Sequence, residues 1–210
     1  MRVRLLLLAL LLPPSLAGAD PVALRLPGGS AAEVVVAAGW PQQSAGVWFT
    51  PNFGMAMELR LPLGTVGGSL GGRQTVARGR KGWGLEVFGA GGVSTTLADH
   101  SIAMAATAAV QGGVLSKRGL LFSVGIAMPA VLRMGRGPHP VQGKLPFLLE
   151  VHGGVDAGPL WLGVTASGGV VFSTDAGLSN AFGVAAWLRI PLPRFGGPQK
   201  TTPSWALGRT

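Results

Sequence analysis

The segment FGMAMELRLPL, residues 53–63, alternates between two kinds of side chain. Every odd position is apolar, whereas every even position is small, charged or proline. The apolar set is Phe53, Met55, Met57, Leu59, Leu61 and Leu63, and the other set is Gly54, Ala56, Glu58, Arg60 and Pro62. Because side chains alternate across a β-strand, this period of two predicts a strand with two unlike faces.

The same alternation recurs along the chain, in residues 32–40, 83–97, 102–114, 120–134, 145–157, 160–172 and 178–192. Together with residues 53–63, these segments predict about eight strands. Most connections between them are short, which favours antiparallel neighbours. Several of the segments are longer than the five or six residues that are usual in soluble sheets.

Two intervening stretches are interpreted as loops. Residues 41–52 form the first, although Val47, Trp48 and Phe49 could extend a strand. Residues 64–81 form the second, which is rich in glycine and arginine. A loop of that length is unusual. It either contains a hairpin, which would raise the count to ten strands, or is a loop. As a loop, it is a solvated basic segment or binds a periplasmic partner, and the solvated segment is favoured.

The composition excludes several classes of protein. Charged residues make up only 12% of the chain, about half the share of a typical soluble domain, and 35 of the 210 residues are glycine. There is no cysteine, so disulfides and thiolate chemistry are excluded. The three histidines are scattered, and we predict no metal site and no cofactor. The net charge is +9, but basic and aromatic residues do not interleave, so we predict no nucleic-acid partner.

The N-terminus has the pattern of a secretory signal peptide. Residues 1–19 combine two early arginines, the apolar run 5–12 and the small residues Ala17-Gly18-Ala19. The apolar run is shorter than the roughly 20 residues that a membrane-spanning helix requires. We therefore expect cleavage near Ala19, followed by an N-terminal lead over residues 20–31, a barrel over residues 32–192 and a tail over residues 193–210.

The apolar strand faces have no predicted helix to cover them. A sheet with such a face must meet lipid, and in lipid it must close so that no edge is left unpaired. The sequence thus predicts an all-β, antiparallel, up-and-down transmembrane β-barrel with its apolar face outward. Ionisable residues fall on the opposite, small-residue face, where they would form a network in the lumen: Glu33, Glu58, Arg60, Glu86, Arg133, Glu150, His152 and Arg189. Such a network is either an ion-paired plug or an ion path.

Over residues 32–192 the chain resembles the small outer-membrane β-barrel proteins of Gram-negative bacteria. The resemblance implies contact with outer-membrane lipid and lipopolysaccharide, and a non-enzymatic role as a structural barrel or narrow channel. The chain departs from this class because it has no Tyr for the aromatic girdles. Trp40, Trp48 and Trp83 would serve instead, whereas Trp161 and Trp187 fall on the inward phase.

Two alternatives remain open. The first is a soluble secreted β-barrel that binds an apolar ligand, which would need apolar side chains inside and polar ones outside. The second is an outer-membrane hydrolase acting on lipid, for which Ser101, His100 and Asp99 supply the residue types of a catalytic triad within one turn.

Overall fold

The computed structural model describes residues 32–40, 42–50, 52–60, 64–79, 82–98, 100–135 and 141–192. The predicted signal peptide with its cleavage site near Ala19, the lead over residues 20–31 and the tail over residues 193–210 lie outside the described residues. In the part of the chain that is described, no helix is long and apolar enough to cross a membrane.

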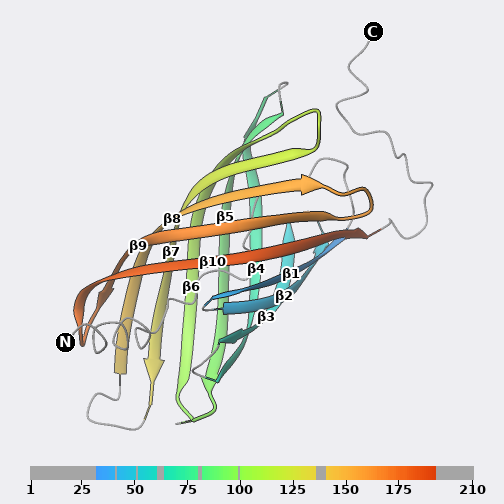
Figure 1. Ribbon diagram of the computed structural model, residues 1–210. Coiled ribbons are helices and arrows are strands. Elements are labelled where there is room, and N and C mark those ends of the chain that lie inside the picture. Colours follow the sequence, from blue (N-terminus) through green and yellow to red (C-terminus); the bar gives the residue numbers. More distant parts are fainter. Residues whose placement is uncertain are drawn as a thin grey trace, which may run out of the picture.

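Ten antiparallel strands form one closed barrel (Figure 1). They are β1 (Ala32–Trp40), β2 (Gln42–Thr50), β3 (Phe53–Arg60), β4 (Thr65–Arg78), β5 (Trp83–Thr96), β6 (Ile102–Leu115), β7 (Leu120–Met134), β8 (Val141–Asp156), β9 (Trp161–Ser173) and β10 (Gly177–Leu192). Each strand pairs with its neighbours in sequence, and β10 pairs with β1. The all-β, up-and-down architecture predicted from the sequence is confirmed, with ten strands in place of about eight.

The two additional strands lie where loops were expected. β2 occupies most of residues 41–52, and β4 occupies most of residues 64–81. β4 lacks a visible alternation because glycine stands on both of its faces, for example at Gly67 and Gly68. The basic stretch is thus largely a strand that pairs with β3 and β5, and this strand accounts for part of the rise to ten strands.

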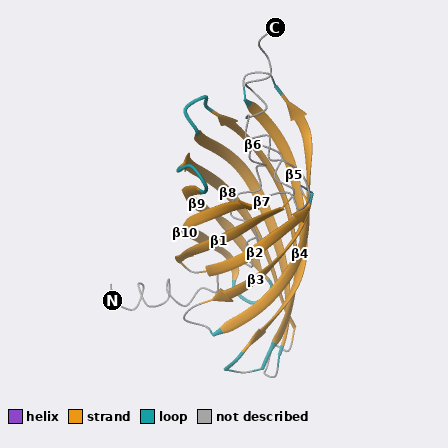
Figure 2. Ribbon diagram, turned by 90° about the vertical axis from the view of Figure 1, so that its right-hand side faces the viewer, coloured by secondary structure: helices purple, strands orange, loops and turns teal. Residues whose placement is uncertain are grey.

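The ten strands give the barrel two distinct ends. β1 begins and β10 ends at what we call the terminal end, and the opposite rim is the far end. In the described connections, several glycines at or next to a turn have a positive φ, which side-chain-bearing residues rarely adopt: Gly64, Gly82, Gly119, Gly158 and Gly177. Figure 2 shows the strands and their short turns from the side.

The outer face of the wall is apolar and the lumen face is small or polar. β7 shows this most clearly, because exposed and buried residues alternate along Leu120–Met134. Phe122 and Ile126 are more than half exposed, whereas Ser123 between them is fully buried in the lumen. The outer face thus carries the long hydrocarbon side chains that the alternation in the sequence predicts.

Aromatic side chains fill the lumen toward the terminal end. Trp161 and Trp187 pack with Ala37 and Leu121, and Trp48 packs with Phe88 in a second cluster. Trp48 is only 4% exposed, so its assignment to an outer girdle is wrong. In β2 it lies on the same face as the buried Ser44 and Gly46, which is the lumen face. Trp40 and Phe182 do form an aromatic pair, with centroids 5.1 Å apart.

Inward glycines make room for these rings. A Cβ atom at Gly154 would lie 2.5 Å from the Trp187 ring, and one at Gly54 would lie 2.8 Å from the Trp48 ring. Gly163 faces the same Trp187 ring even more closely. The high glycine content of the lumen face therefore has a packing reason, since a side chain at these positions would displace an indole ring.

Candidate functional site in the charged lumen

Near the terminal end, the lumen contains a buried carboxylate between two guanidinium groups. Glu33 Oε2 lies 3.0 Å from Arg189 Nη2 and 3.5 Å from Arg73 Nη2. All three side chains are almost completely buried, at 3% exposure or less. Burying such charges is costly unless they are paired, so the cluster is stable only as a unit.

Three different parts of the wall supply this cluster. Glu33 lies on β1 and Arg189 on β10, the two strands that meet where the barrel closes, and Arg73 reaches them from β4. The Arg73 guanidinium carbon also lies 4.2 Å from the centroid of the Trp48 ring, a cation–π contact. The cluster therefore connects the closure seam to the strands β2 and β4.

Arg73 is the member that the sequence analysis did not include. The reason is that residues 64–81 were interpreted as a loop, in which an arginine is ordinarily solvated. A usable signal was present, because Arg73 is in phase with Thr65, Ser69 and Gly71 on the small-residue face of what is now β4.

A second polar group lies on β8 and β9. His152 Nδ1 lies 2.7 Å from Thr165 Oγ1, and His152 Nε2 lies 3.6 Å from Glu150 Oε2. His152 is 1% exposed, whereas the Glu150 side chain is 20% exposed. The threonine hydroxyl and the Glu150 carboxylate lie at the two ring nitrogens, and the hydroxyl fixes the orientation of the imidazole ring.

The remaining predicted lumen residues are spread along the wall. Thr75 Oγ1 donates to Glu86 Oε1 at 3.0 Å, and Arg133 Nε donates to Ser101 Oγ at 2.8 Å. Glu58 is also buried, at 8% exposure. The side chain of Arg60 lies outside the described part of the chain. The structure thus brings Glu33 together with Arg189, and His152 with Glu150, while Glu58, Glu86 and Arg133 occupy other positions on the lumen face.

Two members of the triad considered from the sequence, Ser101 and His100, differ in their surroundings. Ser101 is buried and accepts a hydrogen bond from Arg133, whereas the His100 side chain is exposed. Asp99 lies outside the described residues. Among the residues that are described, no group of three or more His, Asp or Glu side chains is close enough to hold a metal ion.

The fold and the lumen together define a class: a closed antiparallel β-barrel of the outer-membrane type, apolar outside and polar inside. No protein-family model matches the chain, and no curated protein matches it. Among solved structures, the β domain of the Bordetella autotransporter BrkA is similar, at 11% sequence identity and a TM-score of 0.37. That alignment covers 77% of this chain and 98% of the other. The likeness concerns barrel architecture only.

Proposed function

We propose that this protein is a non-enzymatic, integral outer-membrane β-barrel whose lumen is closed by its own side chains. One observation carries the proposal: long hydrocarbon side chains cover the outer face, while Glu33, Glu58, Arg73, Glu86, His152 and Arg189 are buried inside. A charge facing hydrocarbon at mid-membrane costs roughly 2 to 4 kcal/mol, so this partition suits a wall surrounded by lipid. It is the reverse of what a soluble barrel with an apolar ligand requires.

The closure of the lumen is argued from burial near the terminal end. Glu33, Arg73 and Arg189 lie there together with the rings of Trp48 and Trp187, and all five side chains are at most 4% exposed. Water of a continuous pore would expose at least some of these side chains. We therefore favour the ion-paired plug over the ion path, and we assign the barrel a structural role rather than conduction.

Membrane insertion and conduction are tested separately. Protein refolded into lipid vesicles should float with them and should migrate on a denaturing gel at different positions with and without heating. A soluble fraction that does not float would contradict the membrane proposal. In planar bilayers, the inserted protein should give no stable conductance steps. Steady, ion-selective steps that change when Glu33 is neutralised would instead establish a conducting lumen.

A further inference from the structure

Two prolines face each other across the ladder between β7 and β8. The two strands are paired up to Ala127, which lies opposite Leu148, and again from Val131 onward. By this register Pro129 lies opposite Pro146, and the pairs that residues 128–130 would form with β8 are missing. Both prolines are fully buried. Proline within a sheet is ordinarily confined to edge strands, strand beginnings and bulges, so two opposed prolines inside a closed wall are a special feature.

The missing pairs have a chemical cause. Residues opposite each other at a hydrogen-bonded antiparallel pair exchange two N–H···O bonds, and proline has no N–H to donate. Two prolines at one such pair remove both bonds, on which the pairs before and after also depend. On their other sides, Pro129 stays paired with Thr107 and Pro146 with Val171. The loss is therefore confined to the contact between Pro129 and Pro146, which we call the proline seam.

The proline seam weakens the wall at one place. Elsewhere in the ladder between β7 and β8, separating the strands breaks backbone hydrogen bonds, and in lipid no water replaces them. At the proline seam there is no such bond to break, and both proline carbonyls already lack a cross-strand donor. Local separation of β7 from β8 therefore costs less there than in the uninterrupted part of the same ladder.

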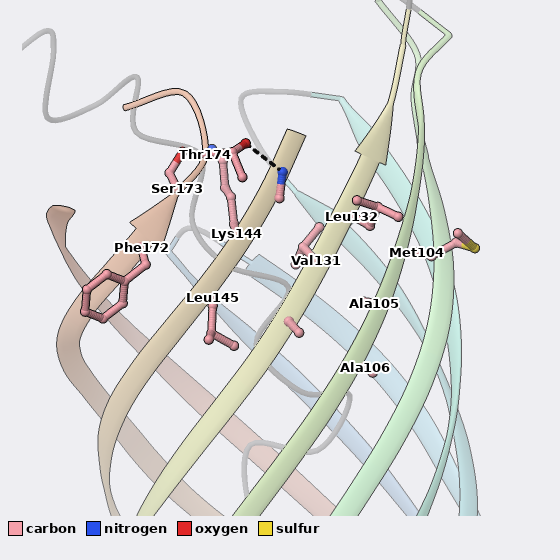
Figure 3. Close-up of a pocket in the computed structure, with 12 residues that line it drawn as sticks. Met104, Ala105, Ala106, Val131, Leu132, Lys144, Leu145, Phe172, Ser173 and Thr174 are labelled. Carbon is pink, nitrogen blue, oxygen red and sulfur yellow. Dashed lines mark hydrogen bonds between the residues drawn. The ribbon is translucent and has the colours of Figure 1, made fainter. Parts of the chain in front are cut away.

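A hollow of about 670 Å³ borders the proline seam on its far-end side (Figure 3). Its lining includes a row of directly paired residues that share the lumen phase of their strands, namely Ala105, Val131, Lys144 and Ser173. It also includes outward-facing residues of the same strands, among them Ala106, Ala130 and Leu145. Residues of both faces of the wall thus line one space, directly beside the pair at which the ladder is interrupted.

The charged cluster near the terminal end does not take part in this hollow. Glu33, Arg73 and Arg189 are absent from its lining, which is formed by residues toward the far ends of β6, β7, β8 and β9. A route through the wall at the proline seam would therefore connect the far half of the lumen with the surroundings of the barrel without passing the cluster.

We propose that β7 and β8 separate at the proline seam and form a lateral opening between the hollow and the surrounding bilayer. The outward residues at the seam are Met128, Ala130, Leu145 and Phe147, all of them exposed and apolar, so lipid hydrocarbon borders the opening from outside. The opening gives this hydrocarbon access to the hollow, while the charged cluster keeps the lumen closed along its axis. This inference rests on the proposed membrane location, to which it adds a passage in the plane of the membrane.

Local separation is measured by amide hydrogen exchange, followed by NMR on protein in lipid nanodiscs. Only protein that passes the flotation test is used, so failure to insert counts against the membrane proposal and not against the opening. The amides of Ala127 and Leu148, which form the last pair before the seam, are compared with those of Ser123 and His152, a pair of the same hydrogen-bonding phase in the same ladder.

Exchange at Ala127 and Leu148 should be about thirtyfold faster than at Ser123 and His152, because two neighbouring ladder bonds are missing. Fraying from the strand end would give the opposite order, since Ser123 lies nearer than Ala127 to the beginning of β7. Equal exchange rates for the two pairs would overturn the opening.

Restoring the hydrogen bonds tests whether the prolines are the cause. The double variant Pro129→Ala and Pro146→Ala regains two N–H donors, so exchange at the pair before the seam should slow to the rate of the comparison pair. If the double variant does not fold, Pro129→Ala alone regains one donor and should slow this exchange about fivefold. Pro191→Ala is the matched control, because Pro191 lies in an intact ladder opposite Glu33, and it should leave the rates unchanged. Undiminished exchange in the alanine variants would refute the role of the prolines.

Access of hydrocarbon to the hollow is tested with a fluorescent label at Val131→Cys, quenched by phospholipids that carry a nitroxide on the acyl chain. Ala90→Cys is the control, because Ala90 shares the lumen face but lies on β5, away from the seam. Quenching should be stronger at Val131→Cys, and it should fall to the level of the control when both prolines are also replaced by alanine. Equal quenching at the two sites, or quenching that the proline replacements leave unchanged, would overturn the passage.

Discussion

The Arg189 guanidinium lies 3.0 Å from the Glu33 carboxylate across the seam at which the last strand closes onto the first. When β1 and β10 pair, both charges are buried, and burial of an unpaired charge would be costly. The same pairing brings the two charges together, and Arg73 on β4 adds a second guanidinium group. Closure of the barrel therefore also pairs the buried charges. The seam is thus specified by side chains as well as by the ladder.

Neutralising Glu33 should therefore destabilise the barrel strongly. In Glu33→Gln the two guanidinium groups lose the Glu33 carboxylate, and removing one partner of a buried pair costs about 3–5 kcal/mol. The free energy of unfolding in urea, measured in vesicles, provides the readout. Glu150→Gln is the control, since Glu150 is partly exposed and should cost less than about 1 kcal/mol. Equal losses for the two variants would mean that the Glu33 cluster has no special role in closure.

Adding a methyl group at Gly154 should cost stability because the Trp187 ring occupies that space. Overpacking of this kind costs about 1–3 kcal/mol. The neighbouring residue gives a matched control: a Cβ at Gly153 would meet no atom within 4 Å. Gly153→Ala should change the unfolding free energy by no more than about 0.5 kcal/mol. If Gly154→Ala were equally neutral, the inward position of Trp187 would be in error.

A positive charge on the outer face should be penalised according to its depth. Ile126 lies in the middle of β7 and Leu120 lies at its beginning, and both side chains are more than half exposed on the outer face. Ile126→Lys should cost about 2–4 kcal/mol in a bilayer, whereas Leu120→Lys should cost about 0–1 kcal/mol. Unfolding in vesicles measures both. Similar small costs at the two positions would indicate an outer face surrounded by water.

The turn between β9 and β10 should contribute a small pH-dependent term. The Ser173 hydroxyl donates to Asp175 and, with Lys144, lowers the pKa of that carboxyl below its usual value. A carboxyl with a depressed folded-state pKa adds stability above its unfolded-state pKa of about 3.9, and this stability is lost as the pH falls through the folded-state pKa. Ser173→Ala should thus raise the pKa of Asp175, as followed by NMR titration. An unchanged pKa in this variant would refute the hydroxyl's role.

The sequence predicted a strand and its inward side best where the side chains on the two strand faces differ most. β7 alternates large apolar with small residues, so both its extent and its inward side could be read directly. β4 could not, because glycine occupies both faces and erases the period of two. Because residues 64–81 were interpreted as a loop, Arg73 could not be assigned to the lumen face or to the outer face.

The pairing register between neighbouring strands also could not be predicted from the sequence. The prolines at 129 and 146 are visible in the sequence, but nothing local states that they face each other. Their opposition depends on the length of the turn between β7 and β8 and on the tilt of the strands. In the same way, Glu33 and Arg189 were each predicted to be inward, whereas their contact follows from where the barrel closes.

The central claim is that hydrocarbon covers the wall and that polar groups fill the lumen. Because the chain has no cysteine, single cysteines can be spin-labelled at each position from Phe122 to Met128 of β7 in vesicles. Collision with dissolved oxygen, which concentrates in lipid, should be high at Phe122, Val124, Ile126 and Met128 and low at the residues between them. The account would be contradicted if labels at Phe122, Val124, Ile126 and Met128 collided with a water-soluble nickel complex instead of with oxygen. A collision profile without a period of two would also contradict it.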